Sequence, residues 1–310
     1  MTFAILSHPD SLRHLAPPGH PERVARIEAV SAALAAPEFA AALRVEAPLA
    51  GDAAILRAHS AAHLRRLEAA APAAGFAALD GDTSLSPGSL DAARRAAGAN
   101  VKAVDMVLGG EVSSAFCAVR PPGHHAERET AMGFCFFSNA AIGALHALEA
   151  HGLSRVAIAD FDVHHGNGTQ DVVQADSRIF FASSHQSPLY PGTGMEDETG
   201  VGNVLNATLA PRSDGAAFRK AWEERLLPAI DAHAPELLII SAGFDAHRRD
   251  PLAELTLDEA DFVWITEKLA DLAARRCAGR LVSTLEGGYD LDALAASVAG
   301  HAKVLMERAS

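Results

Sequence analysis

The sequence contains little cysteine and no long apolar run, and both absences restrict its class. Its three cysteines, Cys117, Cys135 and Cys277, are an odd number without CxxC spacing. This argues against a disulfide framework or a thiolate metal site and favours a reducing compartment, so we expect a cytoplasmic protein. No stretch has the apolar length of a membrane span, so we expect no membrane partner. The short apolar run near the N-terminus has no basic residues before it, and we therefore expect no signal peptide.

Positive charge is also scarce. Lysine and arginine together number 26 against 39 aspartates and glutamates, which gives a formal net charge of -13. An acidic surface argues against nucleic acid as the main partner and is compatible with cationic substrates. Hydrophobic residues make up 49% of the chain, enough for a large core, and no linker-like segment or internal repeat divides it. We expect residues 1–310 to form a single domain.

Short apolar or β-branched runs alternate with long alanine-rich stretches along the chain. Several short runs are apolar on both faces, as buried parallel strands are. The alternation predicts an α/β fold with an open, mainly parallel sheet flanked by helices on both faces. The expected strands are Phe3–Leu6, Ser114–Val119, Val156–Asp160, Ile179–Ser183, Leu237–Ser241 and Leu281–Leu285. The expected helices are Pro21–Leu34, Ser89–Leu108, Asn139–His151, Ala216–Ala232, Asp258–Ala274 and Leu291–Glu307. Ser89 and Asp258 are expected to supply acceptors at two helix starts, and Ala71–Gly88 is expected to be a loop.

Four polar segments each follow the carboxyl end of an expected strand. They contain His124-His125, the run from Asp160 to His165, Gly243-Phe-Asp245 and Glu286-Gly-Gly-Tyr289. Ligands bind at this edge of an open parallel sheet. Core packing would not deliver histidine, aspartate and tyrosine from four strands to one edge, so we expect the active site there.

Three of these side chains form a candidate metal site. Asp162 and His164 are two residues apart at the end of a strand, so both can face one ion. Asp245 comes from another strand end. Two carboxylates and one imidazole leave a position for water, as catalytic metal sites do, and this chemistry leaves Zn²⁺, Fe²⁺ and Co²⁺ open. The alternative is that Asp160 and Asp162 cap a loop and that the histidines are ordinary packed residues.

The motifs resemble those of one enzyme family. Residues 160–170 resemble the metal motif of the histone deacetylase family, and Arg120-Pro-Pro-Gly-His-His-Ala126 resembles its tandem-histidine motif. The resemblance spans nearly the whole chain from His20 onward and is closest to the class II and bacterial deacetylase-like amidohydrolases. It implies the arginase/deacetylase fold and a zinc ion on Asp162, His164 and Asp245. Further segments match in the same order: Met132–Phe136, Tyr190–Gly194, Ser241–Asp245 and Glu286–Tyr289.

The resemblance also implies roles for the catalytic groups. His125 is expected to be the general base and acid, and His124 its electrostatic partner. Asp160 is expected to hold His124, and Asn167 to orient His125 without adding charge. Tyr289, after two glycines, is expected to donate a hydrogen bond to the oxygen that gains negative charge.

A substrate tunnel and a second cation are implied in the same way. Phe134 and Tyr190 match two aromatic walls that suit a slim alkyl chain. Gly133 is expected to offer its backbone to the amide, and Asp82 aligns with a residue at the tunnel rim. A structural K⁺ ion is expected close behind the zinc, held by Asp160, Ser183 and the backbone of Asp162 and His164.

We therefore expect zinc-dependent hydrolysis of acyl amides on lysine side chains, with water attacking the amide. An acetylpolyamine amidohydrolase is the alternative within the same chemistry. A metal-dependent protein that binds acyl-lysine without catalysis is an alternative of another class, against which His125 and Tyr289 argue. An arginase-like ureohydrolase shares the fold but uses two metals and more carboxylates. The sequence leaves the acyl chain length and the oligomeric state open.

Overall fold

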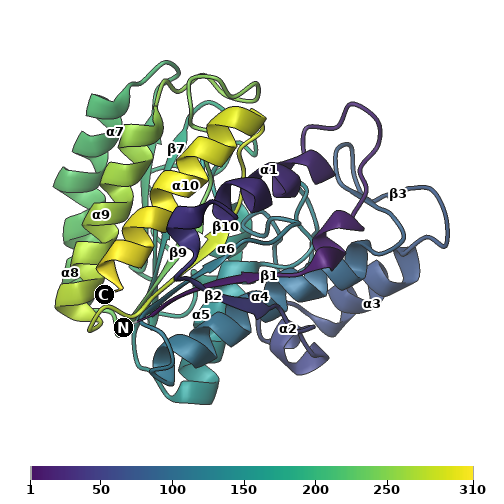
Figure 1. The fold of residues 1–310 in the computed structure, drawn as a ribbon, viewed down its shortest axis with the longest axis horizontal. Coiled ribbons are helices and arrows are strands. Elements are labelled where there is room, and N and C mark those ends of the chain that lie inside the picture. Colours follow the sequence, from purple (N-terminus) through teal and green to yellow (C-terminus); the bar gives the residue numbers. More distant parts are fainter. Residues whose placement is uncertain (1, 310) are drawn as a thin grey trace.

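The computed structural model describes residues 2–309, which are built around a parallel sheet (Figure 1). Within this range eight strands form one sheet in the order β2-β1-β5-β10-β9-β6-β7-β8, and all neighbouring pairs are parallel. The strands are β1 (Phe3–Ser7), β2 (Leu43–Glu46), β5 (Ser114–Cys117), β6 (Val156–Asp160), β7 (Ile179–Gln186), β8 (Val204–Leu209), β9 (Leu237–Ala242) and β10 (Leu281–Leu285).

Helices cover both faces of the sheet, and each face has its own hydrophobic cluster (Figure 1). On one face lie α2 (Asp52–Ala58), α3 (Ala61–Ala70), α4 (Ser89–Leu108), α5 (Asn139–His151) and α6 (Asn167–Val173). On the other lie α1 (Val24–Leu34), α7 (Gly215–Ala221), α8 (Leu227–His233), α9 (Glu259–Arg276) and α10 (Leu291–Arg308). No helix within residues 2–309 is long and apolar enough to cross a membrane.

The sequence-based fold class is confirmed, as are most expected elements. Strands β6 and β10 have the expected bounds and are buried at every residue, because each lies inside the sheet with a helical layer on both sides. Helices α4 and α5 also have the expected bounds. Asp258 caps α9 in a capping box with Asp261.

Other expectations about local structure were wrong. Helix α1 begins at Val24 rather than Pro21, because Pro21 and Glu22 form a bend and Arg23 is extended; Glu22 is buried there. Ser89 does not cap α4; its hydroxyl accepts from the Ser86 N–H and contacts His14 instead. The expected helix over 216–232 is present, but a π-helical turn over Trp222–Leu226 separates α7 from α8 just before Pro228, which has no N–H to donate. The expected loop over 71–88 contains a short hairpin of β3 (Ala77–Ala78) and β4 (Ser84–Leu85).

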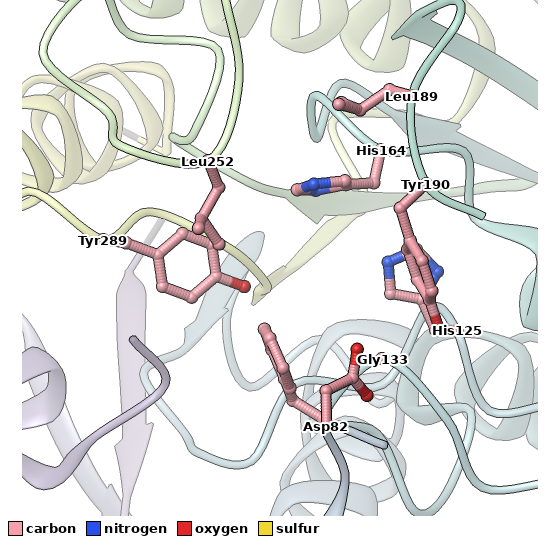
Figure 2. A pocket seen from close by; sticks show the side chains of 9 residues that line it. Asp82, His125, Gly133, His164, Leu189, Tyr190, Leu252 and Tyr289 are labelled. Atoms are coloured by element: carbon pink, nitrogen blue, oxygen red, sulfur yellow. The ribbon is translucent and has the colours of Figure 1, made fainter. Parts of the chain in front are cut away.

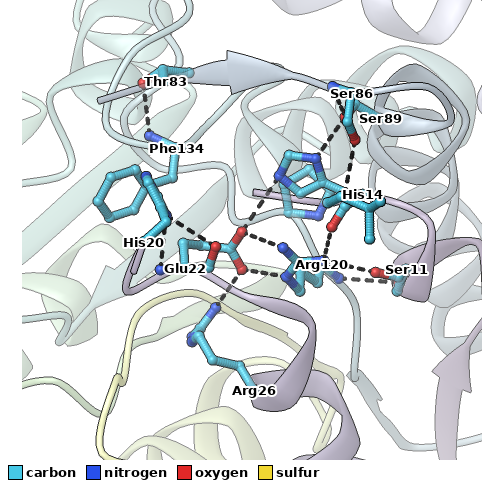
Figure 3. Close-up of polar contacts among 12 residues, drawn as sticks. Ser11, His14, His20, Glu22, Arg26, Thr83, Ser86, Ser89, Arg120 and Phe134 are labelled. Atoms are coloured by element: carbon cyan, nitrogen blue, oxygen red, sulfur yellow. Dashed lines mark hydrogen bonds and ion pairs between the residues drawn. The ribbon is translucent and has the colours of Figure 1, made fainter. Parts of the chain in front are cut away.

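A buried ion cluster links the N-terminal segment to the carboxyl edge of the sheet (Figure 3). Glu22 is fully buried, and Arg120 donates to it at 2.7 Å and Arg26 at 3.1 Å. Arg120 directly precedes the Pro-Pro-Gly turn that follows β5. Arg26 also donates to the carbonyls of Glu286 at 2.5 Å and Gly288 at 2.6 Å in the segment after β10. One carboxylate therefore anchors two of the four polar segments.

We predict that Glu22→Gln lowers the free energy of unfolding by about 3–5 kcal/mol, because it leaves two buried guanidinium groups without a counter-charge. Urea unfolding followed by circular dichroism measures the change. Glu28→Gln, at an exposed position of the adjoining helix α1, is the matched control and should change the value by less than about 0.5 kcal/mol. A loss for Glu22→Gln as small as that of the control would contradict this role.

Candidate active site

A cavity of about 210 Å³ opens at the carboxyl edge of the sheet (Figure 2). Seven of its lining residues are among those expected from the sequence, and they come from segments far apart in the chain. Leu189 and Leu252 also line it and were not expected. The seven are Asp82, His125, Gly133, Phe134, His164, Tyr190 and Tyr289.

The structure brings Asp162, His164 and Asp245 together at the cavity floor. All three are buried, and one potential ligand atom from each lies within 4.8 Å of the other two. His164 Nδ1 lies 3.1 Å from Asp162 Oδ1 and 3.2 Å from Asp245 Oδ2. The strand ends of β6 and β9, which are neighbours in the sheet, produce this convergence.

This group has the shape and charge that suit a divalent cation. A Cβ atom on Gly287 would lie 2.0 Å from Asp245 Oδ2, so only glycine leaves the carboxylate its place. Burial alone would lower the pKa of His164, but its hydrogen bonds to Asp162 and Asp245 raise it to about 10. Two buried carboxylates thus favour positive charge at this point. Oxygen and nitrogen ligands of this kind bind divalent transition metals.

His124 lies beside the metal-ligand group and is held by Asp160. Its Nδ1 is 3.0 Å from Asp160 Oδ2, and its Nε2 is 3.7 Å from Asp162 Oδ1. Burial opposes a charge on His124, but the two carboxylates outweigh burial and raise its pKa well above the ordinary value. The imidazole is therefore suited to carry positive charge.

His125 has the opposite environment. Its Nδ1 lies 2.7 Å from Asn167 Oδ1, and its ring lines the cavity 4.0 Å from that of His124, measured between centroids. Burial and then the neighbouring His124 lower the pKa of His125 well below the ordinary value. A neutral imidazole with a hydrogen-bonded Nδ1 has a free lone pair on Nε2, which a general base requires.

Tyr289 lies across the cavity, with its hydroxyl oxygen pointing toward the centre (Figure 2). Burial raises the pKa of the phenol well above its ordinary value, so the hydroxyl keeps its proton and can donate it in a hydrogen bond. The Arg26 guanidinium lies 4.8 Å from the ring centroid. Asp250 accepts the backbone N–H of Tyr289 at 2.7 Å. The ring and its backbone are thus fixed from two sides.

The walls of the cavity contain backbone in the left-handed region. Gly133 has φ 54°, and a Cβ there would lie 2.4 Å from the ring of His125. Phe134 has φ 69° and donates its N–H to Thr83 Oγ1 at 3.0 Å. The ring of Tyr190 packs edge-on against the ring of His125, with 5.2 Å between the ring centroids. The Asp82 carboxylate accepts from Thr83 at 2.9 Å, which ties the expected rim residue to the Phe134 wall.

The residues expected to hold K⁺ lie behind this floor. Asp160 and Ser183 face each other across β6 and β7, and both are buried. Ser183 Oγ lies 3.0 Å from His185 Nδ1, and Asp160 Oδ1 accepts the Asp162 N–H at 3.1 Å. Burial raises the pKa of Asp160 to about 6, although His124 opposes the shift.

Several residues that position the site were given no role from the sequence, although Glu286 was named there as part of a polar segment. Glu286 accepts the N–H groups of Gly123 at 2.6 Å and His124 at 3.2 Å, and so connects the tyrosine segment to the tandem histidines. Its place beside two glycines was the available signal. For Asp250 the available signal was its place directly before Pro251, two residues from Leu252. Arg26 had none, because a helical arginine usually lies at the surface.

Comparisons with known proteins show which chains and folds this protein is similar to. The histone deacetylase domain model matches residues 20–305. An uncharacterized protein of Synechocystis is 43% identical over 98% of this chain and 99% of its own length. The histone deacetylase-like amidohydrolase of Pseudomonas aeruginosa is 41% identical over 78% of this chain and 65% of its own length. The HDA15 HD domain, known from a crystal structure, is 34% identical in sequence to this chain. The two structures superimpose with a TM-score of 0.94 over 99% of this chain and 90% of that one.

The matched region contains all four polar segments, and the similarity covers both the sequence and the three-dimensional fold. The architecture is that of the arginase/deacetylase proteins, as expected. The chain therefore belongs to the histone deacetylase family and is a hydrolase of the deacetylase type.

Proposed function

We propose that this chain is a zinc-dependent hydrolase of acyl amides on lysine side chains. The observation that supports it best is the convergence of three kinds of group on one cavity. These are the Asp162, His164 and Asp245 cluster, the neutral His125 and the hydroxyl of Tyr289. The aromatic side chains of Phe134 and Tyr190, which line the cavity, suit an extended methylene chain that ends in an amide.

The proposed chemistry assigns one task to each group. Zinc on the cluster would polarise the amide carbonyl and activate a water molecule. His125, oriented by Asn167, takes the proton from water as the oxygen adds to the carbonyl carbon, and then delivers it to the departing amine as the C–N bond breaks. Tyr289 donates a hydrogen bond to the carbonyl oxygen as its negative charge grows. His124 supplies positive charge beside these steps.

Three further assignments complete the proposal. K⁺, held by Asp160 and Ser183 with backbone oxygens of Asp162 and His164, would fix the segment that carries two zinc ligands. Residues 1–310 form one catalytic domain, which the match over residues 20–305 supports. The protein works in the cytoplasm, which its three free and buried cysteines support.

We expect Asp245→Ala to lose the metal and the activity together while the sheet remains folded. The two remaining ligands cannot hold a zinc ion as tightly, and catalytic zinc sites use three protein ligands. Elemental analysis of the purified protein, with circular dichroism as the check on folding, measures this. Asp197→Ala, an exposed position, is the control and should retain about one zinc per chain. Full zinc content in Asp245→Ala would remove this residue from the site.

Tyr289→Phe should lower kcat by about 10²–10³ with little change in KM, because it removes a hydrogen bond made to the developing charge. Tyr190→Phe is a matched control. It also removes one phenol oxygen at the cavity but keeps the ring, and it should leave kcat nearly unchanged. Steady-state kinetics on a fluorogenic acetyl-lysine amide measure both variants. Equal kcat values for Tyr289→Phe and the wild type would exclude the oxyanion role. Absence of turnover in the wild type would favour the non-catalytic binder.

The substrate class is tested by comparing an acetyl-lysine peptide with acetylated putrescine and spermidine. We expect higher kcat/KM for acetyl-lysine, since a neutral methylene chain fits between Phe134 and Tyr190. Asp82 and the net charge of -13 favour the polyamines, but long-range charge is screened within about 8–10 Å at physiological salt. A ten-fold advantage for the polyamines, about 1.4 kcal/mol, would establish the acetylpolyamine alternative.

A further inference from the structure

The amide of Asn167 lies between two partners of different chemistry. Its Oδ1 lies 2.7 Å from His125 Nδ1. Its Nδ2 donates to Glu127 Oε1 at 2.8 Å and faces the sulfur of Met132 at 3.3 Å. Glu127 follows the tandem-histidine motif directly in sequence but does not line the cavity.

The partners on the Nδ2 side determine which way the amide points. A side-chain amide can turn over and exchange its oxygen and nitrogen, but a carboxylate offers only acceptors and a thioether sulfur is a weak acceptor. Glu127 and Met132 therefore require Nδ2 on their side, which leaves Oδ1 facing His125. Since Oδ1 can only accept, His125 Nδ1 must carry the proton. The lone pair is then on Nε2.

The reversed amide would have the opposite consequence. Its NH₂ group would face His125 Nδ1, which would then have to accept, and the ring proton would move to Nε2. That tautomer has no lone pair on Nε2 with which to take a proton from water. A single amide rotation therefore separates a competent base from an incompetent one.

We propose that Glu127 is a positioning residue that sets the tautomer of His125 through Asn167. The proposal rests on the proposed function in that His125 is the base. Glu127 acts on its neighbour and touches neither the substrate nor the metal ligands.

Glu127 is itself held in place by its backbone. Its N–H donates to Thr130 O at 2.9 Å, and its carbonyl accepts from His59 Nδ1 at 2.9 Å. The other ring nitrogen of His59 accepts the Ser138 N–H at 2.9 Å, so this buried ring is neutral and its tautomer is fixed. Burial lowers the pKa of His59 to about 3, which keeps it neutral. The carboxylate is therefore presented to Asn167 from a rigid segment.

The structure suggests a rescue experiment. Glu127→Ala leaves the Asn167 amide free to reverse, and we expect kcat/KM for the acetyl-lysine peptide to fall about ten-fold. Asn167→Asp replaces the amide by a carboxylate, which presents an acceptor oxygen in either orientation and needs no partner to orient it. In the Asn167→Asp background the Glu127→Ala change should cause no loss, and it should increase activity because it removes a second carboxylate 2.8 Å away.

Two further variants separate positioning from general damage. Glu129→Ala changes an exposed carboxylate of the same segment and should match the wild type. Glu127→Gln keeps the shape of the side chain and can still offer an amide oxygen to Asn167. Its kcat/KM should therefore fall less than that of Glu127→Ala. An equal loss from Glu127→Ala in the wild-type and Asn167→Asp backgrounds would overturn the proposal.

The tautomer can also be read without substrate. In protein labelled with ¹⁵N-histidine, two-bond couplings to the ring protons show which nitrogen is protonated, and His125→Gln identifies the His125 signals. We expect Nδ1–H in the wild type and a substantial Nε2–H population in Glu127→Ala. Unchanged His125 signals in Glu127→Ala would overturn the proposal. Because this measurement needs no turnover, an inactive wild type would contradict the proposed function and leave the tautomer test standing.

Discussion

The buried carboxylate of Glu22 is the interaction on which the arrangement of the active site depends. It binds Arg120, which immediately precedes the turn of the tandem histidines, and Arg26, which holds the carbonyls of the tyrosine segment. Hydrogen bonds between guanidinium and carboxylate groups are directional, so they specify where the two segments lie as well as holding them together. Glu286 makes a second connection between the same segments through the N–H groups of Gly123 and His124. The site is therefore positioned by buried charge at the edge of an apolar sheet.

Acidic groups gather at this edge in greater number than the nearby basic side chains. Burial in one small region raises the energy of every carboxylate that lacks a counter-charge, and it raises the pKa of Asp250 and of Glu286 to about 7. Arg26, Arg120 and His124 balance part of this charge, and a divalent cation would balance more. The pKa values of the tandem histidines shift in opposite directions, because His124 faces carboxylates whereas His125 faces a neutral amide. The buried acids are Glu22, Asp160, Asp162, Asp245, Asp250 and Glu286.

The central strands and the catalytic motifs could be predicted from the sequence because their signals are local. Val156–Asp160 is a continuous apolar run that ends in a polar cluster, and this pattern specifies both a buried strand and the site at its end. The edge strands β2 and β8 were missed because partly exposed strands lack such a run. The burial of Arg26 could not be predicted, since the two carbonyls to which it donates lie 260 and 262 residues away and no local pattern distinguishes it from a surface arginine. Glu127 could have been suspected from its adjacency to the motif, but its role depends on the side to which Asn167 turns its nitrogen.

The position of β10 in the sheet has a consequence for how the protein is made. β10 is the last strand in the sequence, yet it lies in the middle of the sheet. Among the described residues it is the sole link between β2-β1-β5 and β9-β6-β7-β8. During synthesis, the three candidate metal ligands and the tandem histidines emerge on two separate groups of strands. Pairing across so many residues is slow, because the loop must close before contacts compensate for its entropy. A nascent chain that already carries every candidate metal ligand therefore cannot assemble the reaction centre until its final strand leaves the ribosome. Tyr289 lies four residues after the end of that strand.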